Sequence, residues 1–160
     1  MILSCDLINK GFSLSKVNNS DLLDYLLVKK KCYKKYVDEY FGGWIDDVQI
    51  EKNTTVFNNM NNQSCFQKIL FNNETVGFLA YDEQEDKIDG ISIQIIEKAQ
   101  NKGVGSFYLN HITLLSKKNK NPIFLKVFKS NPAKNLYERF GFIIYDETFS
   151  HYLMKYVPKN

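Results

Sequence analysis

The first pattern along the chain is a two-residue alternation in "GFSLSKV" (residues 11–17), where Phe12 and Leu14 alternate with serines. That period is typical of a half-buried strand. In the following segment, "NNSDLLDYLLVKKKCYKKYV" (residues 18–37), the apolar residues recur three or four positions apart. Because Asn19 or Ser20 can cap a helix start, the pattern predicts a strand followed by a helix of about five turns.

Later segments alternate between strand and helix signals. The glycine pair at 42–43 ends the first helix, and uneven apolar spacing over 45–60 predicts a weaker second one. Three strands are then predicted over 64–72, 74–82 and 87–96. Asn72-Asn73 is predicted to form the hairpin turn between the first two strands, and the charged run 82–86 the turn between the second and third. The remaining segments predict a helix from about 104, a strand at 122–128, a short helix at 131–142 and a final hairpin.

The order β-α-α-β-β-β-α-β-α-β-β predicts an α/β (mixed α+β) fold with helices on both faces of the sheet. The length of 160 residues suits a single domain, 1–160, with one hydrophobic core. A formal charge of +3 is too mild to indicate a nucleic-acid binder. The basic runs "VKKKCYKKY" and "SKKNKN" favour solvated helix surfaces, with attraction of an anionic ligand or partner as the alternative.

The cysteines and the N-terminal residues bear on the cellular compartment of the protein. Cys5, Cys32 and Cys65 share no metal-ligand spacing, and an odd, scattered set fits a reducing compartment. The first residues, "MILSCDLINKGF", are not typical of a signal peptide, and no apolar run approaches the ~18 residues of a membrane span. We therefore expect a cytoplasmic protein that binds neither membrane nor nucleic acid.

The stretch "QNKGVGS", residues 100–106, places two glycines where a helix begins. The P-loop pattern fails because Lys102 precedes Gly103, and the dinucleotide pattern fails because Tyr108 holds the third glycine position. A helix N-terminus nevertheless offers free N–H groups and a positive dipole end, and glycine lets an anion approach the backbone. A loose turn without a ligand is the alternative.

A second motif, "NPAKNLYERFGF" (residues 131–142), follows the next strand. Together the two stretches resemble the signature of the GNAT superfamily, the Gcn5-related N-acetyltransferases, and the ending "SHYLMKY" and the "YFGGW" segment resemble bacterial small-molecule members. The first family motif, Q/R-x-x-G-x-G/A, is matched by Gln100, Gly103 and Gly105. The second is matched by Asn131, Pro132, Ala133, Leu136, Tyr137, Glu138, Gly141 and Phe142.

The resemblance implies a mostly antiparallel sheet of about six or seven strands, with a V-shaped splay between the fourth and fifth. It implies acetyl-CoA as cosubstrate and no metal. The loop backbone would hold the pyrophosphate of coenzyme A, the strand edge would pair with the pantetheine arm, and Asn131 would hydrogen-bond the cofactor. The implied cofactor-binding residues are Ile93, Ile95, Gln100, Asn101, Lys102, Gly103, Val104, Gly105, Ser106 and Asn131.

Tyr137 would be the general acid that protonates the departing thiolate. A tyrosine with a pKa near 10 stays protonated at neutral pH and can donate, although aromatic packing is the alternative role. The general base is open among Glu39, Asp46, Asp47 and His151. Trp44 is a candidate floor for the acceptor pocket, which gives Glu39, Trp44, Asp46 and His151 as acceptor-side residues, each with a structural alternative. His111 is expected to be structural.

The function that the resemblance implies is acetyl-CoA-dependent transfer of an acetyl group to a primary amine of a small molecule or protein, in a monomer or homodimer. The alternative is a catalytically degenerate relative that binds acyl-CoA for sensing or interaction. A nucleic-acid binder using the Lys29 to Lys35 run is a third class, but it lacks interleaved aromatic platforms beyond Tyr33 and Tyr36.

Overall fold

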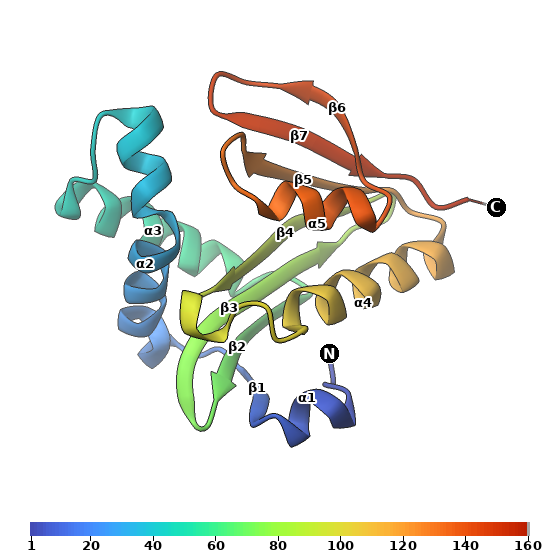
Figure 1. The fold of residues 1–160 in the computed structure, drawn as a ribbon, viewed down its shortest axis with the longest axis horizontal. Coiled ribbons are helices and arrows are strands. Elements are labelled where there is room, and N and C mark those ends of the chain that lie inside the picture. The colour runs from blue at the N-terminus through green and yellow to red at the C-terminus, as the bar shows by residue number, and fades with distance from the viewer. Residues whose placement is uncertain (160) are drawn as a thin grey trace.

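A single seven-stranded sheet organises the chain (Figure 1). The computed structural model describes residues 1–159. Strand order is β1-β2-β3-β4-β5-β7-β6, and every neighbouring pair is antiparallel except β4 and β5. The strands are β1 (Phe12–Lys16), β2 (Cys65–Phe71), β3 (Glu74–Glu83), β4 (Ile88–Ile95), β5 (Ile123–Phe128), β6 (Ile143–Glu147) and β7 (His151–Tyr156). The predicted mixed, mostly antiparallel sheet is confirmed.

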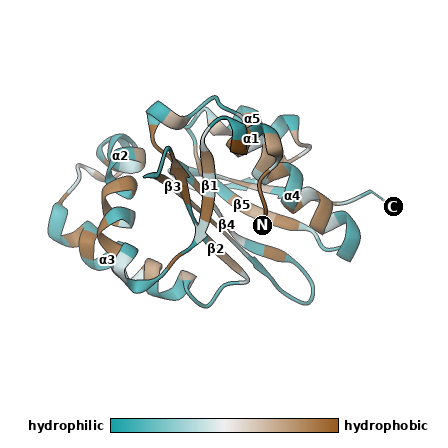
Figure 2. Ribbon diagram, turned by 90° about the horizontal axis from the view of Figure 1, so that it is seen from below, coloured by the Kyte–Doolittle hydropathy of each residue, from teal (hydrophilic) through white to brown (hydrophobic). Residues whose placement is uncertain are grey.

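Helices cover both faces of this sheet, as predicted (Figure 2). The long helices α2 (Leu22–Phe41) and α3 (Asp46–Met60) lie on one face, and α4 (Val104–Asn119) and α5 (Ala133–Arg139) lie on the other. Short 3₁₀ turns at Asn19–Asp21 and Glu97–Ala99 precede α2 and α4. Within residues 1–159, no helix has the length and apolar character needed to cross a membrane.

One helix, α1 (Cys5–Asn9), was not predicted from the sequence. It precedes β1 and has only five residues, too few for a periodic pattern. The Ser4 side chain accepts a hydrogen bond from the Leu7 N–H, and buried Leu7 fixes the turn against the core. The order of elements is otherwise the predicted one.

Aromatic side chains fill the core on the α2–α3 face. The Tyr25 ring of α2 lies 5.2 Å from Phe57 of α3 and 5.3 Å from Phe78 of β3, measured between ring centroids. On the opposite face, Tyr108 and Ile112 of α4 are fully buried against the sheet. The strands between the two layers are therefore apolar on both sides, which is why β3 is buried over most of its length.

The feature that shapes the site is the separation of β4 from β5. Their only paired residues are Ile88 and Ile123, at the start of both strands. Beyond that pair the two parallel strands diverge, and β4 remains hydrogen-bonded only to β3 (Figure 1). The expected V-shaped splay between the fourth and fifth strands is confirmed, and it leaves one backbone edge of β4 open towards its C-terminal end.

Candidate active site

The loop between β4 and α4 presents a row of unpaired backbone donors. None of the N–H groups of residues 101–106 donates a backbone hydrogen bond, and no side chain caps the start of α4. The first turn of α4 contains no acidic residue, and its last turn contains Lys117 and Lys118. Free N–H groups and an uncompensated positive helix end create an anion-binding site.

Two left-handed residues give this loop its shape. Asn101 has φ +59° and Gly103 has φ +99°, with Lys102 between them outside the positive-φ region. Alternation of this kind turns successive N–H groups towards one side and forms a concave anion-binding nest. The backbone geometry of the loop is therefore of the kind that can accept a phosphate-sized anion.

The two glycines of the loop have different physical reasons. Gly103 is required by its backbone conformation, because few side chains tolerate φ +99°. Gly105 has an ordinary helical backbone, but a Cβ atom there would lie 3.2 Å from the Leu136 side chain of α5. Gly105 therefore also allows α4 and α5 to approach each other, which the sequence pattern alone did not reveal.

Gln100 connects the loop to the open strand. Its Nε2 donates a hydrogen bond of 2.7 Å to the Ile95 carbonyl at the end of β4. Ile93 and Ile95 are half-buried on β4, and they pair on the β3 side with Leu79 and Gly77. The loop and the exposed strand edge thus form one continuous surface, long enough for an extended ligand with an anionic end.

Two further predicted cofactor residues are Lys102, within the loop, and Asn131, which follows β5. Lys102 is exposed, and its Nζ lies 5.6 Å from the centre of the Phe71 ring. The Asn131 Oδ1 accepts a hydrogen bond from the Ala133 N–H at the start of α5, which spans Ala133–Arg139 within the predicted 131–142 segment. Asn131 is half-buried, and its Nδ2 has no partner within residues 1–159, so it remains available as a donor.

Tyr137 of α5 is 8% exposed and packs on Phe142, with ring centroids 5.9 Å apart. Burial raises the pKa of Tyr137 to about 12, so the phenol is fully protonated at neutral pH. Its hydroxyl has no hydrogen-bond partner within residues 1–159. Tyr137 is close enough to Tyr33 of α2 to add to the effect of burial in raising the pKa of that residue.

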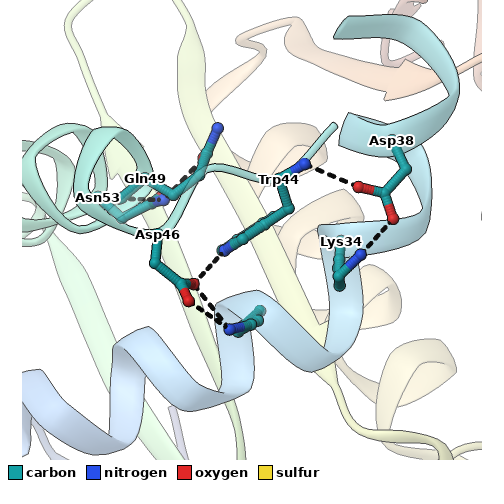
Figure 3. A network of polar contacts seen from close by, with 7 residues as sticks. Lys34, Asp38, Trp44, Asp46, Gln49 and Asn53 are labelled. Atoms are coloured by element: carbon teal, nitrogen blue, oxygen red, sulfur yellow. Dashed lines mark hydrogen bonds and ion pairs between the residues drawn. The ribbon is translucent and has the colours of Figure 1, made fainter. Parts of the chain in front are cut away.

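Trp44 and Asp46 belong to a polar network at the junction of α2 and α3 (Figure 3). The Trp44 indole donates to the Asp46 carboxylate at 2.8 Å, and its backbone N–H donates to Asp38. The Lys30 ammonium also binds Asp46 at 2.7 Å, and these hydrogen bonds, Lys30 first, hold the pKa of Asp46 below its usual value. Asp46 is therefore a weak proton acceptor, and Asp47 beside it is exposed.

Glu39 and His151 lie closer to the end of β5. Glu39 is exposed and accepts a hydrogen bond of 2.6 Å from the Ser130 hydroxyl. The His151 ring lies 4.0 Å from the Phe128 ring, and its Nδ1 is 2.8 Å from the Ser150 hydroxyl. Burial, with repulsion from lysines on α3 and β5, lowers the pKa of His151, so the imidazole is mostly neutral at pH 7.

Three further residues on α2 face the same region and were not identified as site residues from the sequence. The Lys29 ammonium lies 4.3 Å from the centre of the Tyr33 ring. Cys32 is half-buried, and burial raises the pKa of its thiol to about 11. Cys32 is therefore not a thiolate at neutral pH. The spacing of positions 29, 32 and 33 places the three residues on one side of α2, and this helical spacing is the sequence signal that could have identified them.

The chain belongs to the acetyltransferase (GNAT) family, whose model matches residues 29–142. No curated protein matches the sequence. Among solved structures, the chain is similar to the PaiA N-acetyltransferase from Thermoplasma acidophilum in complex with coenzyme A. That similarity has a TM-score of 0.71 and 17% identity, and covers 91% of this chain and 98% of the other.

Two other solved structures are similar to this chain, one of an N-acetyltransferase and one of a protein in complex with a bisubstrate analogue. The ribosomal-protein-S18-alanine N-acetyltransferase from Escherichia coli has 18% identity and a TM-score of 0.64, over 93% of this chain and 96% of its own. Naa50 from Arabidopsis thaliana, in complex with a bisubstrate analogue, has 19% identity and a TM-score of 0.62, over 91% and 98%. At these identities the likeness establishes the shared fold.

Proposed function

We propose that the protein transfers an acetyl group from acetyl-CoA to a primary amine. The observation that carries this proposal is the continuous surface formed by the unpaired N–H groups of residues 101–106 and the open edge of β4. An extended thioester with a pyrophosphate fits such a surface, since its anionic part matches the nest and its amide-containing arm matches a free strand edge. Family membership and neighbours described as bound to coenzyme A support the assignment.

Acetyl-CoA supplies an activated carbonyl, and the protein supplies proton acceptors and donors around it. A neutral amine forms the new N–C bond while the C–S bond breaks, and one proton leaves the nitrogen as another reaches the sulfur. Tyr137 donates that proton to sulfur, because its pKa of about 12 keeps the phenol protonated. Direct transfer is favoured over a covalent route through Cys32, whose thiol is protonated at neutral pH.

His151 is the proposed proton acceptor, directly or through one water. Its imidazole is mostly neutral at pH 7, half-buried and held by Ser150 and Phe128. Among the alternatives, Asp46 is engaged by Lys30 and Trp44, and Glu39 by Ser130. The acceptor therefore approaches from the α2–α3 face, opposite the loop that holds the pyrophosphate.

The test is release of coenzyme A from acetyl-CoA with a panel of amines, together with direct binding of acetyl-CoA. Tyr137→Phe should lower kcat by roughly 10²–10⁴-fold while leaving the Kd for acetyl-CoA unchanged, because only the proton is removed. Tyr156→Phe is a matched control, since Tyr156 packs on the same Phe142 ring with centroids 5.6 Å apart.

Three outcomes separate the possibilities. Acetyl-CoA binding that is equal in all variants, with turnover that falls only in Tyr137→Phe, supports both the activity and the acid. Turnover that is equal in Tyr137→Phe and wild type eliminates the role of Tyr137 but leaves acetyl transfer. Binding of acetyl-CoA without turnover of any amine overturns the enzymatic proposal in favour of a non-catalytic acyl-CoA-binding protein.

A further inference from the structure

Cationic side chains from several elements surround the proposed acceptor side of the splay. Lys29 of α2 lies over the Tyr33 ring, which is 6.1 Å from Phe128 of β5, and Phe128 is 4.0 Å from the His151 ring. Lys126 is two residues before Phe128 on β5, so both side chains lie on the same face of the sheet. Helix, strand and hairpin thus bring two lysines and a histidine to one region.

Lys52 of α3 belongs to the same group. The charges of Lys52 and Lys126 act together with burial to lower the pKa of Lys29 to about 8. The same two lysines act with burial to lower the pKa of His151. Lys52 is exposed on α3 and acts on Lys29 and His151 through its charge. Lys29, Lys52, Lys126 and His151 are called the cationic cluster below.

No carboxylate neutralises the lysines of this cluster. Within residues 1–159, Lys29, Lys52 and Lys126 form no ion pair, whereas Lys30 and Lys34 on the outer side of α2 are both paired. Glu39, an exposed residue near the end of α2, is engaged by the Ser130 hydroxyl. Lys29 and His151 are half-buried, whereas Lys52 and Lys126 are exposed. Unpaired positive charges that lie near one another repel, and such an arrangement is stabilised when an anion binds.

A cavity begins beside the cluster. It has a volume of about 680 Å³, and its lining includes Lys126, Phe124, Ile91 and Tyr145. Its acidic residues lie near the start of β4, where Asp89 is paired with Lys87. That size suits a small molecule. The cluster and the lining of the cavity share no residue with the loop 100–106, so they are not needed to bind that end of coenzyme A.

We propose that the acceptor is a small amine that carries an anionic group, a carboxylate or a phosphate, which the cationic cluster binds. The inference rests on the proposed function and specifies its substrate class. A simple amine is a cation in solution, and the cluster repels it. An anionic group in the same molecule reverses that interaction and holds the amine near His151 and the splay.

The experiment compares amines that differ only in the anion. β-Alanine is paired with β-alaninamide, and phosphoethanolamine with ethanolamine, and kcat/KM is measured for each with acetyl-CoA in excess. The anionic member of at least one pair should be favoured by about tenfold or more, because charged hydrogen bonds are strong. The pair with the larger ratio identifies the carboxylate or the phosphate as the preferred group.

Variants of Lys126 test the origin of the preference. Lys126→Gln should reduce the ratio by about tenfold through KM, and Lys126→Arg should retain it. Lys117→Gln, an exposed lysine in the last turn of α4, is the control and should leave the ratio unchanged. Equal use of both members of each pair, or a ratio that Lys126→Gln leaves intact, overturns the inference while acetyl transfer stands.

A binding measurement keeps the inference testable if no amine is turned over, which is the result that would refute the proposed function. Calorimetry on the protein saturated with coenzyme A should then show tighter, salt-sensitive binding of β-alanine or phosphoethanolamine than of its neutral partner. Equal binding within both pairs overturns the inference independently of catalysis.

Discussion

Replacing Lys29 by methionine should make the protein more stable at neutral pH. The pKa of Lys29 is lowered from 10.5 to about 8, mainly by burial. That difference corresponds to about 3 kcal/mol of unfavourable free energy in the charged folded state, since each pKa unit is worth about 1.4 kcal/mol. Lys29 is half-buried, and its contact with Tyr33 is lost in the variant, so a net gain of about 1–2 kcal/mol is expected.

The gain should depend on pH in one direction. The folded-state pKa lies below the unfolded value, so the penalty is fully present below about pH 8. It diminishes as the pH rises from about 8 towards 10.5, where both states become neutral. Lys29→Met should therefore exceed wild type in stability at pH 7 and lose most of that advantage near pH 10.

Urea unfolding at several pH values, followed by the fluorescence of Trp44, the single tryptophan, measures this difference. In a thermal scan at pH 7, the same gain in the free energy of unfolding corresponds to a rise in Tm of about 3–6 °C for a domain of this size. Lys35→Met is the control, because Lys35 also lies over a tyrosine, at 4.8 Å from the Tyr36 ring centre, but is exposed. A variant less stable than wild type at pH 7, or an advantage independent of pH, would refute the reasoning.

Three further predictions follow from backbone and charge. Gly103→Ala should cost about 1–2 kcal/mol of stability, because its backbone is left-handed, and should raise the Kd for acetyl-CoA about tenfold. Gly42→Ala, at φ +77° with nothing within 4 Å of the added Cβ, should lose as much stability without weakening acetyl-CoA binding. Denaturation measures the stability loss and calorimetry measures the Kd. Asp21→Asn should cost about 3 kcal/mol in urea unfolding, because it leaves Lys68 without its buried partner, and an unchanged midpoint would contradict this. His151→Asn should remove an acidic limb from the kcat/KM profile with a midpoint below 6.5, and a limb that persists would exclude His151 as the base.

The order of strands and helices could be predicted from the sequence because the residues at the turns have clear conformational preferences. Asn72 and Asn73 adopt positive φ values of 50° and 66°, as a tight asparagine hairpin requires. Gly42, also left-handed, ends α2 where the glycine pair indicated. Helix α1 escaped prediction because five residues held by one serine cap carry no period.

The loop with unpaired N–H groups could be predicted for the same local reason, since one contiguous stretch contains those donors. The acceptor side could not, because the cationic cluster is assembled from residues 29, 52, 126 and 151, which only the tertiary fold brings together. Within the lysine run at 29–35, no sequence pattern separates Lys29, which lies over the Tyr33 ring, from Lys30 and Lys34, which form surface ion pairs. Whether the acceptor-side residues act as proposed stays a prediction.

The divergence of β4 from β5 also divides the molecule mechanically. One residue pair, Ile88 with Ile123, joins a four-stranded half to a three-stranded half, so the sheet has a seam at that point. Amide hydrogens of β5 and β7 should exchange as one cooperative unit, apart from those of β2 and β3. A ligand lying along the open edge of β4 would bridge the seam and couple the two units, and the free protein would then be the state more susceptible to proteolysis.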